Sequence, residues 1–228
     1  MWEEGRPEPP RNPKKGNTMS HAPLSAADSA VVLIDHSVGF SNLIGSHTIQ
    51  ENLDGALALA EIATIFGAPL VVTNGPDDGP AGPLYPELLD VLGDRPVINR
   101  PPTFDAFDDE AFTAAVEATG RRRLIVAGIQ TDVCVALTAL TALDRGYEVY
   151  LVVDASAATT KETHDTAVMR LVQAGAIPVN WLAVGSELLG GWTDDEPSAA
   201  FGRVIHERLA SWRHQNALTA GVRRNATA

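Results

Sequence analysis

The fold is decided by residues 123–137, which read RLIVAGIQTDVCVAL. Residues 123–128 form a short apolar run with β-branched members that ends in Gly128, as expected of a buried strand in a parallel sheet. From Val133 onward, apolar residues recur at helical spacing until Gly146, where we expect the helix to end. This stretch is therefore predicted to be a strand followed directly by a helix.

The single cysteine of the chain, Cys134, lies at the start of that predicted helix. We expect Thr131 to cap the helix N-terminus, with Asp132 in the first turn, where the helix dipole favours a negative charge. Cys134 would then stand near the third helical position, where the dipole lowers the pKa of a thiol and favours the thiolate. A lone cysteine also serves as a small buried hydrophobe. The position of Cys134 alone does not decide whether it is a nucleophile or a buried core residue.

Strand and helix patterns alternate along the rest of the chain. Strands are predicted at residues 30–35, 69–73, 97–99, 123–128, 148–154 and 176–181. Segments with apolar residues at helical spacing separate them. This alternation predicts a three-layer α/β/α fold with a doubly wound, parallel, six-stranded sheet in the order 3-2-1-4-5-6.

One domain, spanning residues 23–217, is predicted between two tails. Residues 1–22 are rich in Pro, Gly, Asn and charged residues without periodicity, so we expect them to be disordered. Met19 lies in this tail, so we expect translation to start at either Met1 or Met19. A last helix is expected over residues 198–215, and residues 218–228 are expected to form a mobile tail.

The composition narrows the range of partners. The 228 residues carry a formal net charge of −12, with a sequence pI near 4.8, which argues against nucleic-acid and anionic-membrane partners. One cysteine excludes an internal disulfide and suggests a reducing compartment. Apolar runs stay well short of the roughly 20 residues that span a bilayer, and the N-terminus lacks the apolar core of a secretion signal. We therefore expect a cytoplasmic protein.

Three reactive side chains follow predicted strands. Asp35 ends the first strand, Arg100 follows the third, and Cys134 follows the fourth. In the predicted order the first and fourth strands are neighbours, and ligands bind beyond the carboxyl ends of strands at such a switch point. Taken singly, Asp35 could cap a loop and Arg100 could be a surface charge. Their convergence from three strand ends on one crevice predicts a catalytic unit.

This unit has an assignable chemistry. Cys134 would attack a carbonyl carbon, while Asp35 would accept the thiol proton, return it to a leaving nitrogen and later activate water. Arg100 stays protonated, so its role is electrostatic and positional. The carboxyl and the thiol would share one proton. Backbone N–H groups at the start of the Cys134 helix are expected to form an oxyanion hole, worth roughly 3 kcal/mol per donor.

Several neighbouring residues have two interpretations. Phe40, Phe104 and Phe107 either line the substrate pocket or belong to a satellite core. His36 and His164 are expected to be hydrogen-bonded scaffold or surface groups rather than ligands.

Cofactor motifs are missing from the sequence. It contains no G-x-G-x-x-G after a strand, no P-loop, no H-E-x-x-H and no G-x-S-x-G. The loop over residues 74–83 has no histidine, and His and Asp do not cluster at metal spacing. We therefore predict neither a nucleotide cofactor nor a metal.

At these motifs the sequence resembles the isochorismatase-like cysteine hydrolases. The matching segments are VLIDH at 32–36, NRP at 99–101, GIQTDVCV at 128–135 and VDA at 153–155. The third of these is the most specific. The resemblance extends over about residues 25–192, and AFD at 106–108 with the stretch 187–192 makes it strongest toward the YcaC-like branch.

The resemblance implies an Asp/Lys/Cys triad, here Asp35, Arg100 and Cys134. It also implies a cis peptide before Gln130 that directs the Gln130 and Cys134 N–H groups at the oxyanion, and assembly into a homo-oligomer. Most of the family has lysine at the position of Arg100, but the YcaC-like branch shares the arginine. The Asp-x-His…His metal pattern of nicotinamidases is absent, which argues against nicotinamidase activity.

Three functions follow as hypotheses. The favoured one is a metal-independent hydrolase that cleaves a small amide or related C–N bond through a Cys134 thioester. The second is a vinyl-ether hydrolase of the isochorismatase type that uses Asp35 without the thiol. The third is a ligand-binding or redox-sensing protein whose Cys134 is modified without turnover. In the first two the partner is a small-molecule substrate, with specificity expected from the loops 37–48 and 74–83.

Overall fold

A six-stranded parallel sheet forms the centre of the protein. The computed structural model describes residues 22–226, and side chains up to residue 220, so the predicted N-terminal tail and Met19 lie outside the described residues except for Ala22. In chain order the strands are β1 (Ser29–Ile34), β2 (Leu70–Asn74), β3 (Val97–Asn99), β4 (Arg123–Gly128), β5 (Glu148–Val152) and β6 (Ile177–Val179). Their spatial order is β3-β2-β1-β4-β5-β6, and every adjacent pair is parallel. The predicted fold class and strand order are confirmed.

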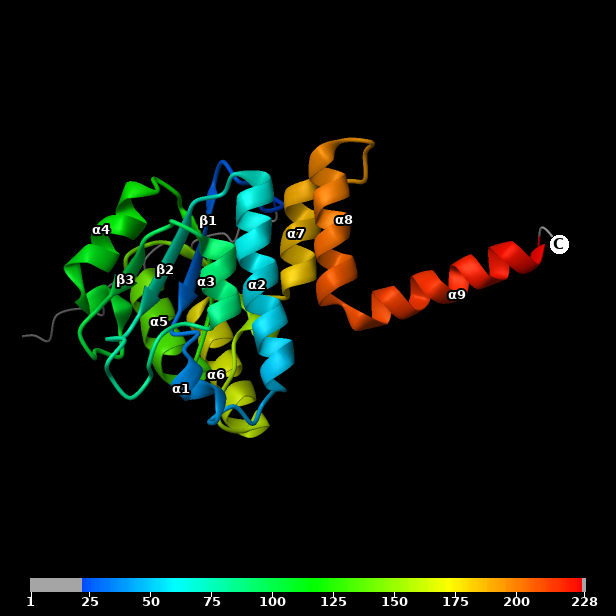
Figure 1. Cartoon of the computed structure of the whole chain (residues 1–228). Helices are drawn as coiled ribbons and strands as arrows, with labels where there is room; N and C mark the ends of the chain where they lie inside the picture. The colour runs from blue at the N-terminus through cyan, green and yellow to red at the C-terminus, as the bar shows by residue number, and fades with distance from the viewer. Residues whose placement is uncertain (1–21, 227–228) are drawn as a thin grey trace, which may run out of the picture.

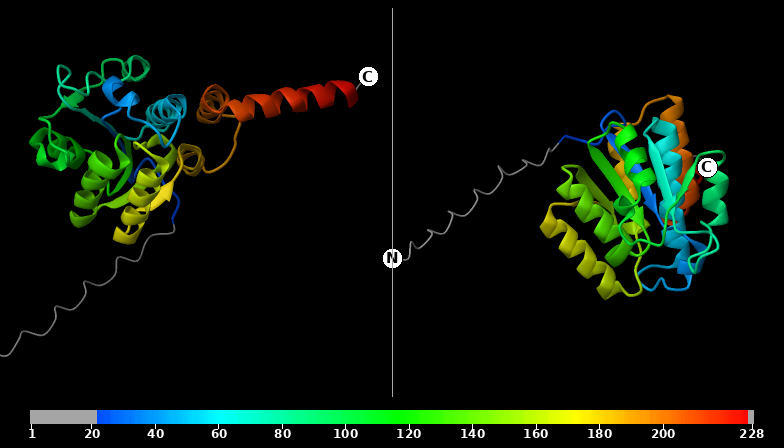
Figure 2. Two further views of the ribbon diagram at one scale, coloured as in Figure 1. Left: turned by 90° about the horizontal axis from the view of Figure 1, so that it is seen from below. Right: turned by 90° about the vertical axis from the view of Figure 1, so that its left-hand side faces the viewer.

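Helices cover both faces of this sheet (Figures 1 and 2). One layer consists of α2 (Ile49–Phe66), α3 (Pro86–Leu92), α7 (Trp181–Leu189) and α8 (Glu196–Arg208). The other consists of α4 (Glu110–Ala118), α5 (Ala136–Asp144) and α6 (Lys161–Ala174). Short helical turns lie at α1 (Val38–Ser41), η1 (Ala106–Asp108) and η3 (Val153–Ala155). Among residues 22–226, no helix combines the length and the apolar character needed to cross a membrane.

The central strands supply both cores because their side chains alternate between faces. In β1, Val31 and Leu33 pack in the core under α2, whereas Val32 and Ile34 pack in the core under α4 and α5. Both β1 and β4 are buried along their whole length. A continuous apolar run is therefore what a central strand covered on two sides requires.

Local signals set the helix that follows β1. Thr48 and Glu51 form a reciprocal capping box at the start of α2, which satisfies backbone N–H groups that have no partner in the helix. Gly67 ends α2 in the left-handed conformation, with φ of 68°. The chain is thereby returned to the sheet at β2.

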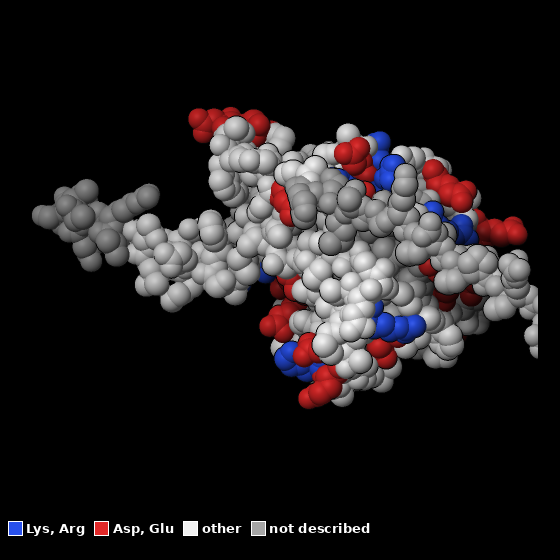
Figure 3. Space-filling model, turned by 180° about the vertical axis from the view of Figure 1, so that it is seen from behind, with Lys and Arg blue, Asp and Glu red and all other residues white. Residues whose placement is uncertain are grey.

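The C-terminal region differs from the prediction. Instead of one helix over residues 198–215 and a mobile tail from residue 218, the structure has α8 and then α9 (Ala210–Ala226), separated by Leu209 in an extended conformation. Helix-favouring Ala, Leu, Gln and Arg residues continue through this segment, which explains the extra helix. The predicted domain boundary at residue 217 thus falls inside α9. This helix extends away from the body, as Figure 1, the left view of Figure 2 and Figure 3 show.

Candidate active site

The first site residue, Asp35, sits in a sharp turn at the end of β1. It has φ of 54°, in the left-handed region that non-glycine residues seldom adopt but that aspartate tolerates better than most. Its N–H donates to the carbonyl of Thr73 at 3.0 Å, and its own carbonyl accepts from the N–H of Ser37 at 2.7 Å. These bonds fix the turn and hold a carboxylate that is only 3% exposed at the carboxyl end of the sheet.

Arg100 binds this carboxylate from the end of β3. Its two terminal guanidinium nitrogens donate to Asp35 Oδ1 and Oδ2, each at 2.6 Å. Because β2 separates β3 from β1, the side chain must bridge two strand spacings, about 9.5 Å. Burial lowers the pKa of Arg100, but the hydrogen bonds and charge of Asp35 outweigh burial and raise that pKa overall. The guanidinium is therefore a permanent cation in the site.

Cys134 lies in a π-helical turn, η2 (Thr131–Val135), that joins β4 to α5. The prediction of Thr131 as a helix cap is wrong: no side chain caps this turn, and the Thr131 hydroxyl instead pairs with His164 Nδ1 at 2.9 Å. The peptide bond between Ile129 and Gln130 is cis, as the family resemblance implied. Turns of this π type recur at functional sites.

A close approach of β4 to β1 brings this turn beside Asp35. Ile34 is paired with Gly128 in the sheet, and a Cβ at Gly128 would collide with the Ile34 carbonyl oxygen. Only glycine fits this contact without displacing the backbone. The strand ends that carry the acid and the thiol can therefore meet.

The resting thiol of Cys134 is neutral, which corrects the prediction of a lowered pKa. Burial, then the negative charge of Asp35 and its hydrogen bond with the thiol, raise the pKa of Cys134 from 9.0 to about 12. Arg100 and the backbone N–H of Gln130, which donates to the sulfur, pull the pKa down but do not prevail. The dipole argument failed because it left out desolvation and the neighbouring carboxylate, both of which disfavour the thiolate.

The structure thus brings the three predicted residues into one contiguous group. The exposed fractions are 2% for Arg100 and 7% for Cys134, so the thiol is the more accessible of the two. Gln130, predicted to line an oxyanion hole, contacts the sulfur through its N–H as described. Of the remaining turn residues, Thr131 donates its N–H to Ala157, while Val133 and Val135 donate theirs to the Gln130 carbonyl.

The three phenylalanines are separated by the fold. Phe107 is a core residue that packs edge-to-face on Phe112 at 5.1 Å between ring centroids, which matches the satellite-core interpretation. Phe104 is 65% exposed, and Phe40 is partly buried against the core under α2. A pocket-lining role for Phe104 and Phe40 stays a prediction.

Both histidines hold the scaffold by hydrogen bonds, as expected. His36 is fully buried and its Nε2 lies 3.0 Å from the Ala155 carbonyl; burial lowers the pKa of His36 to about 4. His164 pairs with Thr131 as noted, and burial lowers its pKa to about 4 as well. Within residues 22–226, no group of three or more His, Cys, Asp and Glu side chains is arranged to hold a metal ion.

Sequence reasoning missed the segment that braces the cysteine turn. Ala157 accepts from the Thr131 N–H at 2.9 Å and donates to the Gly128 carbonyl at 3.1 Å, while the Ser156 hydroxyl accepts from the Gly128 N–H at 3.3 Å. The only sequence signal was the position of these residues just after β5. Their contacts fix both sides of the Gln130 backbone.

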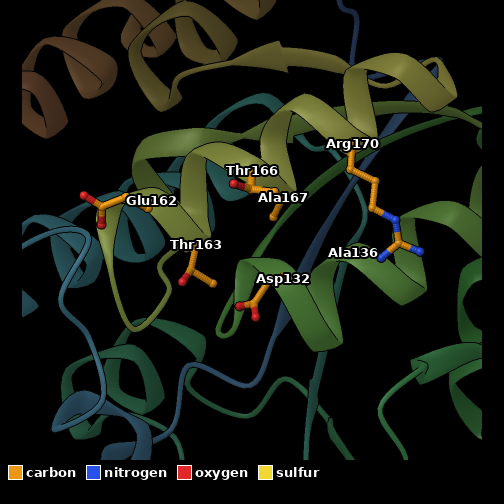
Figure 4. A pocket seen from close by; sticks show the side chains of 7 residues that line it. All are labelled: Asp132, Ala136, Glu162, Thr163, Thr166, Ala167 and Arg170. Atoms are coloured by element: carbon orange, nitrogen blue, oxygen red, sulfur yellow. The ribbon is translucent and has the colours of Figure 1, made fainter.

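A hollow next to the site was also not predicted. It has a volume of about 410 Å³ and lies between the cysteine turn, the start of α5 and α6 (Figure 4). Its lining residues are Asp132, Ala136, Glu162, Thr163, Thr166, Ala167 and Arg170. None of the three site residues lines it.

Comparison with known proteins identifies the family. The family model described as "Isochorismatase domain" matches residues 29–182, and this range contains the whole candidate site. The chain belongs to the isochorismatase family. As a member, it is 40% identical over 178 residues to the "Probable hydrolase YcaC" of Escherichia coli K12, covering 78% of this chain and 86% of that protein.

Two solved YcaC structures have the same fold as this chain over their full length. YcaC from Pseudomonas aeruginosa, described with hexane-2,5-diol and covalent acrylamide, has a TM-score of 0.83 and 37% identity, covering 89% of this chain and 100% of that one. The E. coli YcaC product, described as an octameric hydrolase of unknown specificity, has a TM-score of 0.83 and 35% identity, covering 90% and 100%. The predicted resemblance to the YcaC-like branch is confirmed, and with it the class of probable hydrolase.

Proposed function

We propose that this protein is a cysteine hydrolase that cleaves a small amide or related C–N bond through a thioester on Cys134. One observation carries the proposal: the Asp35 carboxylate, which Arg100 holds through two 2.6 Å bonds, lies close enough to the Cys134 thiol to raise the pKa of that thiol. A nucleophile, a base and a cation that orients the base are therefore in direct contact. We propose a metal-independent reaction because these side chains supply the chemistry it needs.

The raised pKa of Cys134 determines how the attack begins. Because the thiol is neutral at rest, Asp35 takes its proton as the sulfur bonds to the carbonyl carbon, and no stable thiolate forms beforehand. The carbonyl π electrons move to the oxygen, which becomes an oxyanion. Arg100 stays charged and keeps the carboxylate aligned with the thiol.

The oxyanion would be stabilised by backbone donors of the cysteine turn. The Gln130 N–H is the proposed first donor, because it lies near enough to the sulfur to lower the pKa of the thiol. The Cys134 N–H is the proposed second donor, since the Thr131, Val133 and Val135 N–H groups have other partners. Each such donor is worth roughly 3 kcal/mol in acyl-transfer enzymes.

Collapse of this intermediate breaks the C–N bond. The protonated Asp35 gives its proton to the leaving nitrogen, which departs as an amine and leaves a thioester on Cys134. Asp35 then removes a proton from a water molecule that attacks the thioester, and returns that proton to the departing sulfur. The net reaction consumes one amide and one water and yields one carboxylic acid and one amine.

The relatives support both a nucleophilic cysteine and assembly into a homo-oligomer. The P. aeruginosa YcaC structure carries covalent acrylamide, an electrophile that reacts with thiols, which supports a nucleophilic side chain in that relative. E. coli YcaC is described as octameric, so we propose that this chain also acts as a homo-oligomer on a small-molecule substrate. The cytoplasmic location stays a prediction from composition.

Turnover of a panel of small amides tests the proposal. Wild type should release acid and amine from at least one member, and Cys134→Ala should be inactive toward it. Intact mass after a rapid quench should show an acyl adduct on wild type only. Equal turnover by wild type and Cys134→Ala would refute the thioester route. Stoichiometric labelling of Cys134 by iodoacetamide without turnover of any amide would instead favour a binding or redox-sensing protein.

The family description favours vinyl-ether hydrolysis as a second candidate. In that reaction Asp35 would protonate the substrate and the thiol would be dispensable. Isochorismate hydrolysis that survives Cys134→Ala but is abolished by Asp35→Asn would support it over the amide reaction.

A further inference from the structure

Asn74 is a buried polar residue between the two members of the ion pair. It ends β2, the strand that lies between β1 and β3, and it is fully buried. Asp35 follows β1 and Arg100 follows β3, so their side chains meet across the end of β2. The main chain of Asn74 is tied to one of them, because its carbonyl accepts from the Arg100 N–H at 2.9 Å. Its side chain, being buried, needs hydrogen-bond partners of its own.

The carboxamide of Asn74 joins the turn that follows β1 to the loop over residues 74–83. Its Oδ1 accepts from the Ser37 hydroxyl, and its Nδ2 donates to the Gly82 carbonyl at 3.0 Å and to Asp77 Oδ1 at 3.3 Å. Because the Gly82 carbonyl can only accept, the amide nitrogen must face it, and the amide oxygen must face Ser37. One side chain therefore connects a loop expected to set specificity with the turn that carries the base.

This turn needs to be held, because Asp35 adopts an unfavourable backbone conformation in it. Its φ of 54° is sparsely populated by non-glycine residues and persists only where the surrounding structure enforces it. Strand β2 holds the turn at two points: the Thr73 carbonyl accepts from the Asp35 N–H, and Asn74 accepts from the Ser37 hydroxyl. Without the second point, Asp35 can relax toward a common φ, which moves its carboxylate.

We propose that Asn74 is a positioning residue that keeps the Asp35 carboxylate aligned with the Cys134 thiol. This role rests on the proposed function, in which Asp35 is the general base. The side chain of Asn74 acts through Ser37, so it sets the geometry of the base and transfers no proton itself. Small displacements of a catalytic group are costly to the rate, which makes the alignment of this carboxylate a target for such a clamp.

Labelling of Cys134 by iodoacetamide tests this arrangement without a substrate. A carboxylate that drifts from the sulfur raises the pKa of the thiol less, so Asn74→Ala should label several-fold faster than wild type at pH 8. Ser37→Ala removes only the hydroxyl and should also label faster, so it keeps the test valid if Asn74→Ala fails to fold. Because both changes break the same bond, the double variant should label no faster than Asn74→Ala. Wild-type rates in both single variants would overturn the proposal.

The Asp35→Asn background separates positioning from a general loosening of the site. If Asn74 acts through the carboxylate, Asn74→Ala should not speed labelling further once that carboxylate is gone. The same acceleration in both backgrounds would overturn the proposal, because the thiol would then have become accessible by another route. Asn180→Ala is the matched control: this asparagine follows β6 and caps α7 by accepting from the Ala183 N–H at 2.7 Å, so its loss should lower stability and leave labelling unchanged. Equal acceleration in Asn180→Ala would overturn the proposal too.

Turnover distinguishes this role from the proposed function itself. On an amide that wild type cleaves, Ser37→Ala should lower kcat about tenfold or more with little change in KM, because the bonds of Asn74 to the loop over residues 74–83 remain. Wild-type kcat and wild-type labelling in Ser37→Ala would overturn the positioning role and leave the proposed hydrolase reaction unaffected. If wild type cleaves no amide, the labelling rates alone support or overturn the role of Asn74.

Discussion

The neutral thiol of Cys134 leads to a prediction that separates chemical reactivity from turnover. In Asp35→Asn, the thiol loses both the negative charge and the charge-assisted hydrogen bond that raise its pKa, while Arg100 remains nearby as a cation. The pKa of Cys134 should therefore fall. Alkylation of the thiol should become faster in the same variant in which hydrolysis is lost.

The size of the effect follows from the raised pKa. A pKa of about 12 in place of 9.0 makes ionisation about 4 kcal/mol less favourable and leaves about one thiol in 10⁵ ionised at pH 7. Burial is the largest cause and persists in the variant, so only part of the shift is reversed. Each pKa unit regained raises the thiolate fraction about tenfold, partly offset by the weaker nucleophilicity of a less basic thiolate. Loss of the general base should lower turnover by at least about 100-fold.

Iodoacetamide labelling followed by intact mass spectrometry from pH 6 to 10 measures the first effect. Asp35→Asn should label several-fold faster than wild type at pH 8, and Cys134→Ala should not label. Asp154→Asn is the matched control, because Asp154 lies in η3 just after the neighbouring strand β5 and accepts from the Trp181 N–H instead. Circular dichroism checks that each variant is folded. Labelling of Asp35→Asn at or below the wild-type rate would refute the assignment of Asp35 as the group that suppresses the thiolate.

Three further predictions concern stability, each measured by urea unfolding. Arg100→Leu should cost about 3–5 kcal/mol, since it leaves a buried carboxylate unpaired, and Arg100→Lys should cost clearly less; equal costs would contradict the ion-pair account. Gly128→Ala should cost about 1–3 kcal/mol because the added Cβ would collide with the Ile34 carbonyl oxygen, whereas Gly191→Ala, with open space around it, should be near neutral. Because the pKa of His36 is about 4 folded and 6.5 unfolded, the unfolded chain binds more protons at His36 between these values, so His36 alone should lower the free energy of unfolding by up to about 3 kcal/mol as pH drops from 6.5 to 4. His36→Gln should lessen that fall. If the pH dependence of the free energy of unfolding is the same in His36→Gln and wild type, the assignment of the effect to His36 is wrong.

The fold was predictable because its signals are local and repeated. β1 and β4 read as continuous apolar runs, which only a strand buried on both faces requires. Short connections and right-handed crossovers then limit the strand order, so the neighbours β1 and β4 followed from topology rules. The convergence of Asp35, Arg100 and Cys134 is a consequence of that order.

Electrostatics and local backbone geometry were not predictable in this way. The π-helical turn at residues 131–135 was mistaken for an ordinary helix start because its apolar spacing fits both. Phe107 and Phe104 follow β3 within a few residues of each other, yet one is buried and the other is 65% exposed. Helix α9 was missed where its sequence has too few apolar residues to show a buried face.

The sequence by itself determined the order of elements, the strand ends at which reactive side chains appear, and the family. Those features depend on periodicity and on short motifs, which are properties of neighbouring residues along the chain. Only the tertiary structure decided that the Cys134 thiol rests neutral against Asp35, and that α9 leaves the body. A pKa depends on burial and on charges contributed by distant strands, and a projecting helix is defined by the surface it fails to contact, so neither is encoded in local pattern.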